Sequence, residues 1–299
     1  EAFYQLSWKQ TVVDNCGTFF SSADVAADGC NDGYHILNKQ LTQGVVLPNL
    51  AALEAAGLGL QASQEGLMIP RGKDKKPGDS GQWGMALRWM GDNTEYGAYF
   101  MNYHSRMPFL STQNADQATF MGALGTGGIH PLAPAAVLVG RGQYFMDYPE
   151  DIRLYGLSFS TTLPTGTAWQ GEISYRPNAP VQINTQDMTL KLAAGVTDLP
   201  TGGITMAEYL GRAGMLNRGY NRKEITQLQT TLTHFFDQVL GAERATVVGE
   251  IGYVHVGGLE SKYKTAYGRD PIFGSPDSII PDNPSARAVY GRKGFVTKN

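Results

Sequence analysis

Alternating hydrophobic and polar positions recur along this chain in pairs of segments that are joined by tight turns. The clearest pair covers residues 81–106, GQWGMALRWMGDNTEYGAYFMNYHSR. In its first half, Trp83 and Trp89 fall on one face of a period-two pattern, and Arg88 falls on the other among glycine and alanine. The Gly-Asp-Asn sequence at 91–93 favours the backbone angles of a short hairpin loop. The pattern therefore predicts a β-hairpin with an aromatic face and a small, polar face.

The same alternation predicts further strands elsewhere in the chain. They are expected at residues 1–13, 151–163, 168–176, 223–236, 245–256 and 294–296. Short turns at 164–167 and 237–243 join two pairs of these segments. Together with the two strands of the hairpin at 81–106, they give about eight strands.

Long stretches without this alternation separate the strand pairs. They are expected to be loops and cover residues 14–80, 107–150, 177–221 and 257–292. Short helices are expected within these loops at residues 48–57, 113–124 and 206–212. Asn49 is the expected N-cap of the first helix, and Gly57 is its expected C′ residue.

Long connections on one side and tight turns on the other are typical of bacterial outer-membrane barrels. A soluble sandwich would instead place a strand roughly every 8–12 residues. The expected fold is therefore all-β. Residues 1–299 are expected to form a single domain, a partial antiparallel transmembrane β-barrel whose long extracellular loops carry short helices.

In such a barrel, the two faces of each strand meet different surroundings. The apolar face is expected to contact lipid or to lie in the aromatic belt at the membrane interface: Trp8, Trp83, Leu87, Trp89, Trp169, Ile173, Tyr175 and Ile251. The charged face is expected to line the lumen: Lys9, Arg88, Glu172, Arg176 and Glu250. Two alternatives stay open: the aromatic residues form a soluble core, or the charged residues pair across the lumen and fill it. An error of one residue in register would exchange the two sets.

Composition and charge narrow the class of protein. Of the 299 residues 17% are charged, and the net charge is −3. Without a basic cluster, the chain is not expected to bind nucleic acid. No run approaches the ~18 apolar residues of a membrane-spanning helix. The chain starts without Met and inside a strand pattern, so we expect it to be a piece of a longer protein.

The two cysteines, Cys16 and Cys30, flank a stretch that is rich in Gly, Asp, Asn and Ser. A disulfide between them would close a loop of about 15 residues, and it is expected in the oxidising compartment that a barrel implies. Two unrelated, reduced thiols are the alternative. Aspartates at positions 14, 24, 28 and 32 lack the alternation of an EF-hand loop, so no metal site is expected there.

The sequence offers little catalytic chemistry. Motifs of the HExxH, CxxC, GxSxG and phosphate-loop types are missing, and the five histidines are scattered. The Asn-Tyr-His-Ser sequence at 102–105 is the one arrangement that suggests a nucleophile beside a base. Adjacent strand residues point to opposite faces, so His104 and Ser105 are not expected to bond to each other. We expect no enzymatic activity and no cofactor.

Several blocks of the sequence are similar to a known family: LPNLAALEAAGLG at 47–59, the hairpin block at 79–108, YPEDIRLYGLSFSTTL at 148–163, WQGEISYRPNAPVQI at 169–183 and VVGEIGYVHVGGL at 247–259. The chain resembles a central fragment of a family of Gram-negative, Pseudomonas-like proteins that is catalogued only as a domain of unknown function. Family members are roughly twice as long and are expected to be outer-membrane barrels. The resemblance implies an outer-membrane location more firmly than an activity.

The same resemblance suggests partners and a direction for function. Genes of the family often adjoin genes for a second uncharacterised family that resembles periplasmic lipoprotein carriers, and genes for inner-membrane exporters. We therefore expect passage of a small hydrophobic molecule or lipid across the outer membrane, with outer-membrane lipid as a partner. The alternatives are a structural or adhesive surface barrel that acts through its loops, and an outer-membrane lipid hydrolase.

Overall fold

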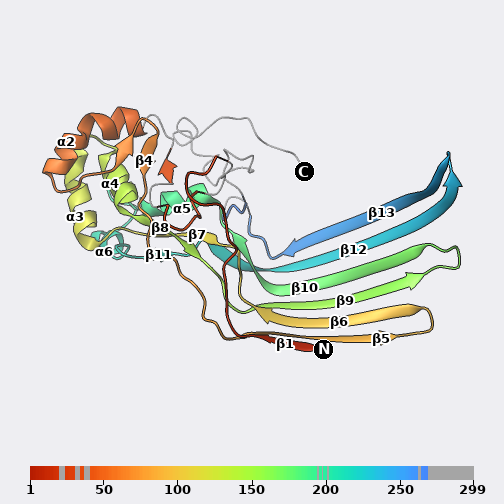
Figure 1. The fold of residues 1–299 in the computed structure, drawn as a ribbon. Coiled ribbons are helices and arrows are strands. Elements are labelled where there is room, and N and C mark those ends of the chain that lie inside the picture. The colour runs from red at the N-terminus through yellow and green to blue at the C-terminus, as the bar shows by residue number, and fades with distance from the viewer. Residues whose placement is uncertain are drawn as a thin grey trace.

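The computed structural model describes residues 1–19, 24–30, 34–36, 41–193, 195–196, 198–200, 202–261 and 264–268. These residues form two regions (Figure 1). A long antiparallel sheet extends to one side. A group of helices and short strands, here called the cap, lies at one end of the sheet and comprises the described parts of residues 6–80, 104–151, 183–219 and 258–268.

The long sheet has seven strands, and neighbouring strands are antiparallel throughout. Their spatial order is β1 (Ala2–Gln5), β5 (Gln82–Met90), β6 (Thr94–Tyr103), β9 (Ile152–Thr162), β10 (Ala168–Gln182), β12 (Tyr220–Val239) and β13 (Ala242–Gly257). The expected antiparallel, β-rich class is confirmed. The sheet is open: β1 and β13 form its two edges, and no pairing within the described residues joins them into a closed barrel.

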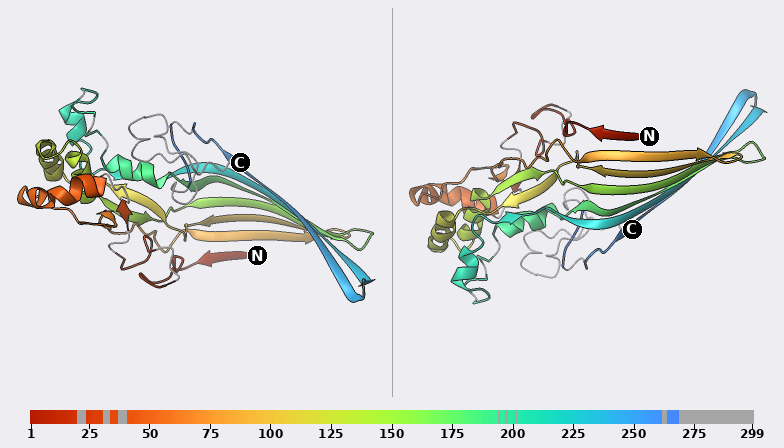
Figure 2. Two further views of the ribbon diagram at one scale, coloured as in Figure 1. Left: turned by 90° about the horizontal axis from the view of Figure 1, so that it is seen from above. Right: turned by 90° about the horizontal axis from the view of Figure 1, so that it is seen from below.

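The three hairpin turns of the long sheet lie together at the end that points away from the cap (Figure 1). Gly166 and Gly241 adopt positive φ angles of 80° and 81° in two of these turns, which a glycine adopts without steric cost. The sheet is strongly twisted, so the β12–β13 hairpin runs at an angle to the other two hairpins at their tips (Figure 2). All the longer connections lie at the opposite end.

Those longer connections do not form separate loops. They fold into one packed unit with two small sheets, β2–β4–β3 and β11–β7–β8. The strands are β2 (His35–Ile36), β3 (Ala62–Ser63), β4 (Gly66–Met68), β7 (Phe109–Gln113), β8 (Gln143–Asp147) and β11 (Leu216–Asn217). The helices are a π-helical segment η1 (Thr42–Val46), α2 (Leu47–Ala55), α3 (Gln117–Gly125), the 3-10 segment η2 (Thr126–Gly128), α4 (Ala133–Arg141), α5 (Thr185–Leu192) and α6 (Met206–Leu210).

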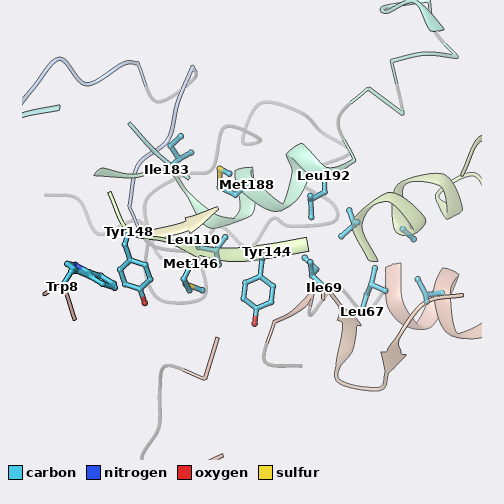
Figure 3. Close-up of a cluster of buried hydrophobic side chains, with 13 residues drawn as sticks. Trp8, Leu67, Ile69, Leu110, Tyr144, Met146, Tyr148, Ile183, Met188 and Leu192 are labelled. Atoms are coloured by element: carbon cyan, nitrogen blue, oxygen red, sulfur yellow. The ribbon is translucent and has the colours of Figure 1, made fainter. Parts of the chain in front are cut away.

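Buried side chains fill the cap in two adjoining clusters. The first cluster includes Leu67, Tyr144 and Met188, which come from three different connections between the long strands (Figure 3). The second cluster includes Phe120 and Tyr209, which are both fully buried, and the Tyr209 hydroxyl donates to the Phe120 carbonyl at 3.0 Å. The cap therefore has the dry, interdigitated interior of a soluble domain.

Several sequence predictions change at this level. The strand expected over 1–13 is wrong beyond Gln5, where β1 ends. Asn49 is not an N-cap: it lies inside the first turn of α2 and donates to the Val45 carbonyl, because η1 extends the helix on its N-terminal side. Gly57 is confirmed as the C′ residue. Its φ is 75°, and its N–H donates to the Glu54 carbonyl in the pattern of a Schellman motif.

The described residues leave out most of the C-terminal segment, and their helices are short. The strand expected at 294–296, and most of the loop expected at 257–292, lie outside them. None of the helices that the described part of the chain forms has the length and apolar character needed to span a membrane.

Candidate functional site

The pairing of the strands fixes which residues share a face of the seven-stranded sheet. One row of directly opposed residues consists of Arg88, Gly97, Ser158, Glu172, Gln229 and Gly252. The adjacent row consists of Leu87, Ala98, Leu157, Ile173, Leu228 and Tyr253. Because successive residues of a strand point to opposite faces, the first row belongs to a polar face and the second to an apolar face.

The apolar face is exposed across the width of the sheet. Leu87 is 65% exposed and Ile251 is 70% exposed, although these residues stand on strands near opposite edges. Aromatic rings contact one another along this face: Trp89 stacks on Tyr96 with centroids 5.5 Å apart, and Phe159 meets Trp169 edge-on at 4.8 Å. Such exposure contrasts with the cap, whose two core clusters bury large apolar side chains.

Most of the residues predicted for the two faces lie where the alternation placed them. On the apolar face are Trp83, Leu87, Trp89, Trp169, Ile173, Tyr175 and Ile251. On the polar face are Arg88, Glu172, Arg176 and Glu250. Their contact with lipid or with a lumen stays a prediction.

Trp8 and Lys9 are the two exceptions, because β1 ends before them. Trp8 is only 7% exposed and packs in the cap, where its ring meets Tyr148 edge-on at 5.0 Å (Figure 3). Its Nε1 donates to the Ser105 carbonyl at 3.2 Å. The assignment of Trp8 to a lipid-facing belt is therefore wrong. Lys9 is exposed, lies outside the sheet and does not share the polar face with the other charged residues.

The polar face is hollowed in the part of the sheet nearer the cap. The hollow has a volume of about 600 Å³ and is lined by small residues that include Gly156 and Ser174. Apolar side chains, among them Phe3, Met101 and Leu154, line it together with charged ones. We call it the amphipathic hollow.

A second hollow of about 420 Å³ adjoins the first and shares Arg88, Tyr99, Ser158 and Glu172 with it. It lies closer to the hairpin turns, and its additional residues are mostly polar, such as Gln170 and Thr231. The two hollows form one track along the polar face, which changes from amphipathic near the cap to polar near the turns.

The charged groups of this track are weakly engaged. Within the described residues, Arg88 and Glu172 make no ion pair or hydrogen bond. Arg176 Nη2 donates to Gln227 at 3.4 Å, a long bond, while its Nε is shielded from solvent and has no partner. Glu250 accepts from the Thr231 hydroxyl at 3.3 Å. Pairing of these charges across a lumen, the alternative that the sequence leaves open, stays a prediction, because the sheet is open within the described residues.

Sequence reasoning missed part of the track. Tyr99 lines both hollows, and its hydroxyl lies 3.2 Å from the Ser158 hydroxyl. Phe3 covers Gly84 so closely that a side chain at position 84 would collide with its ring. The alternation could have placed Tyr99 on the polar face. Tyr99 and Tyr96 are an odd number of residues apart on one strand, so their side chains must point to opposite faces, and Tyr96 lies on the apolar face.

The predicted disulfide is confirmed: the sulfur atoms of Cys16 and Cys30 are 2.02 Å apart. A carboxylate oxygen of Asp24 lies near both sulfurs, but two sulfurs that are bonded to each other are not thiolate ligands for a metal. Asp28 lies within ion-pair distance of Arg71, at 3.8 Å, and of Lys76, at 3.9 Å. The fourth aspartate, at position 32, lies outside the described residues.

His104 and Ser105 do not form a nucleophile–base pair. The His104 ring contacts the Ser80 carbonyl through Nε2 at 2.7 Å and accepts from the Asp151 N–H through Nδ1 at 3.1 Å. The Ser105 hydroxyl donates to the Met107 carbonyl at 2.7 Å. Both side chains thus hold the junction where the strands enter the cap.

A second polar network joins the sheet to the cap. Lys223, at the end of β12 next to the cap, donates to Glu260 at 2.7 Å and to the Gly258 carbonyl at 2.6 Å. Tyr267 donates to the other carboxylate oxygen of Glu260 at 2.5 Å and forms a β-bridge with Ile183 of the cap core. These hydrogen bonds hold the pKa of Glu260 at about 2, below its usual 4.5.

Comparison with known proteins gives a family without a function. No curated protein and no solved structure matches the chain. A family model described as "Protein of unknown function (DUF1302)" matches residues 1–298, which is nearly the whole chain. The resemblance that the strand blocks indicated is thereby confirmed at the level of a family of unknown function, and the chain belongs to that family.

Proposed function

We propose that this protein forms part of a β-barrel in a bacterial outer membrane and provides a passage there for a small hydrophobic molecule or lipid. The observation that carries the proposal is the uncovered apolar face of the seven-stranded sheet. Soluble monomers rarely expose apolar patches of more than a few hundred Å². Lipid tails would solvate this face without cost, as they do the outer face of membrane barrels.

The dimensions of the sheet support the same proposal. Strands β5, β6 and β9 have 9, 10 and 11 residues, which matches the ~9–11 residues of a tilted transmembrane strand. On β5, Trp83 and Trp89 lie near the two ends of the apolar face, roughly 20 Å apart at the usual rise per residue. Membrane barrels carry aromatic girdles at the two edges of an apolar band about 25 Å tall.

The polar face supports passage rather than a filled interior. Two of its charged groups, Arg88 and Glu172, have no ion-pair partner in the described part of the chain, so they would face whatever occupies the barrel. The track of two hollows changes in character along the strands. A periplasmic lipid-carrier-like protein and an inner-membrane exporter, the partners that the family resemblance implies, would deliver the molecule that passes.

A second candidate function is a surface protein that acts through its cap. The observation that favours it is the packed interior of the cap, which is larger than a set of simple loops would need. In that case the sheet would serve only as an anchor in the membrane.

Reconstitution of the full protein in planar bilayers tests the proposal against this second candidate. Passage through the polar face predicts discrete conductance steps, and the charge-removing variants Arg88→Gln and Glu172→Gln should change the ion selectivity in opposite directions. Arg153→Gln is the matched control, since Arg153 pairs with Asn102 on the apolar face of the same sheet. Insertion without any conductance would favour the anchor. Absence of the protein from purified outer membranes would overturn both candidates.

A further inference from the structure

We infer that the amphipathic hollow is a binding site for an amphipathic monocarboxylate, a molecule with an apolar tail and a carboxylate head. The inference rests on the proposed function for its setting, because it names the class of molecule that would enter the passage. The site itself requires only the side chains of the polar face.

Arg176 is the first observation that points to an anionic head group. Buried polar groups in proteins nearly always have a hydrogen-bond partner, and an exception calls for a physical reason. The Nε of Arg176 is shielded from solvent and unpaired, and its one side-chain hydrogen bond, to Gln227, is long at 3.4 Å. A guanidinium has five N–H donors, and among the described residues Gln227 is the one side chain that accepts from Arg176.

Arg88 is the second observation. It lines the same hollow from β5, three strands away from the strand that carries Arg176, and no ion pair among the described residues involves it. Guanidinium groups bind carboxylates and phosphates with paired, charge-assisted hydrogen bonds. Two such groups on opposite sides of one hollow provide two places at which an oxyanion can be held along the track.

The charge balance of the hollow selects a singly charged head group. Glu1 and Glu172 line it together with the two arginines, so charges of both signs are present. A hollow with this balance lacks the strong positive field that concentrates a multiply charged anion such as a phosphate monoester. A carboxylate carries a single charge and matches the planar geometry of a guanidinium.

The apolar side chains that line the hollow would contact the apolar tail of such a molecule. Phe3, Met101 and Leu154 line the hollow on the side towards the cap, in the same row of the polar face as Arg176. The small residues Gly156 and Ser174 leave room between this row and the row that holds Arg88 and Glu172. The volume of about 600 Å³ lies within the ~300–1,000 Å³ of pockets that hold a drug-sized ligand. A chain of methylene groups would thus contact apolar side chains while its carboxylate contacts a guanidinium.

The test is equilibrium binding of labelled dodecanoate to the full protein in lipid nanodiscs, with dodecanol and dodecyl phosphate as unlabelled competitors. Arg176→Gln and Arg88→Gln should each weaken binding about 10- to 100-fold, the usual loss for a charge-assisted hydrogen bond. Gly156→Leu, which fills the hollow, should also weaken binding while both arginines remain. Arg153→Gln removes an arginine from the opposite face of the sheet and should leave binding unchanged. The same variant is the control for dodecanoate that partitions into the lipid of the nanodisc.

Three outcomes would overturn the inference: equal affinities of the Arg176→Gln and Arg153→Gln variants, competition by dodecanol as strong as that by dodecanoate, or tighter binding of dodecyl phosphate than of dodecanoate. Circular dichroism of each variant establishes that it is folded. Conductance of the same preparation separates the two hypotheses. A conducting protein that binds no dodecanoate contradicts this inference alone, whereas specific binding by a protein that is absent from the outer membrane contradicts only the proposed function.

Discussion

The cap and the seven-stranded sheet are built from the same chain, but they bury their hydrophobic residues in opposite ways. In the cap, Phe120, Tyr144 and Tyr209 are fully buried against side chains from distant parts of the sequence. In the sheet, residues of similar size such as Leu87 and Ile251 stay mostly exposed. The cap therefore obtains its hydrophobic stabilisation from within the chain, and the sheet does not.

This difference shows that the sheet needs contacts from outside the chain to bury its apolar face. Its strands are held to one another by backbone hydrogen bonds and cross-strand ring contacts, such as those between Trp83 and Phe100 at 5.0 Å. Burial on its apolar face must come from another phase or another molecule. Stability of the cap should accordingly depend on its own packing, and stability of the sheet on its surroundings.

The largest effect is expected from opening the cap core. Phe120→Ala should destabilise the cap by about 3–5 kcal/mol, because it leaves a cavity beside Tyr209 in a dry interior. Hydrogen exchange should show faster exchange of cap amides with little change in β5 and β6. Met121→Ala is the control, since the neighbouring Met121 is 52% exposed on the same helix. Equal loss of protection in the sheet would show that the two regions do not differ as described.

A smaller loss is expected when the disulfide is removed. Cys16→Ser should cost the cap about 3 kcal/mol by the chain-entropy relation for a loop of this size, since the cysteines are 14 residues apart. Thermal unfolding followed by cap-specific exchange measures it. Reduction of the wild-type protein should reproduce the loss, and the sheet should keep its protection in both cases. Unchanged unfolding after reduction would mean that the loop is already fixed by other contacts, such as the bond from Gln10 to Asp28.

The sheet could be predicted from the sequence because its signal is local. A period of two over ten residues places Trp83 and Arg88 on opposite faces whatever else the chain does, and the turn glycines mark where each strand ends. The amphipathic hollow was only half predictable. Its charged residues follow from the alternation, but Phe3 enters it through the pairing of β1 with β5, which spans about eighty residues of sequence.

The cap could not be predicted in the same way, because its elements are short. Helix α4 has nine residues, too few for its buried positions, among them Ala133, Val137 and Leu138, to give a clear periodic signal. It falls within the loop expected at 107–150, and it contains Pro134, which is tolerated in the first turn of a helix. Strand β7 pairs with β8 and with the short β11, β8 also forms bridges with Arg71 and Lys75, and side chains of α5 pack against these strands, so all these contacts join distant parts of the sequence. Trp8 was misplaced for the same reason.

Charge placed on the apolar face should reveal whether lipid covers it. Ile173→Arg should destabilise the membrane-inserted protein by about 2–4 kcal/mol if its position lies near the bilayer midplane. Ser174→Arg is a matched control, because it introduces the same side chain one residue further along β10, on the polar face. Urea unfolding from vesicles and the yield of inserted protein measure the difference. If Ser174→Arg fails and Ile173→Arg inserts normally, the two faces are reversed and the sheet is a soluble structure.

The smallest effect is expected where the two regions are joined, at Glu260. Its pKa is held at about 2 by the hydrogen bonds from Lys223 and Tyr267, whereas an unfolded glutamate titrates near 4.3. Because the folded pKa is lower than the unfolded one, the network stabilises the joint fully above about pH 5, and this contribution is lost as the pH falls towards 2. Glu260→Gln should remove that pH dependence, which exchange of the Gly258 to Gly268 amides in wild type and variant at pH 6 and pH 3 would measure. Glu243→Gln, at the start of β13 and far from the cap, should follow the wild-type curve. A Glu260→Gln curve that also follows the wild type would mean that the hydrogen bond from Asn221 of β12 to the Tyr267 hydroxyl, rather than the carboxylate, holds the cap to the sheet.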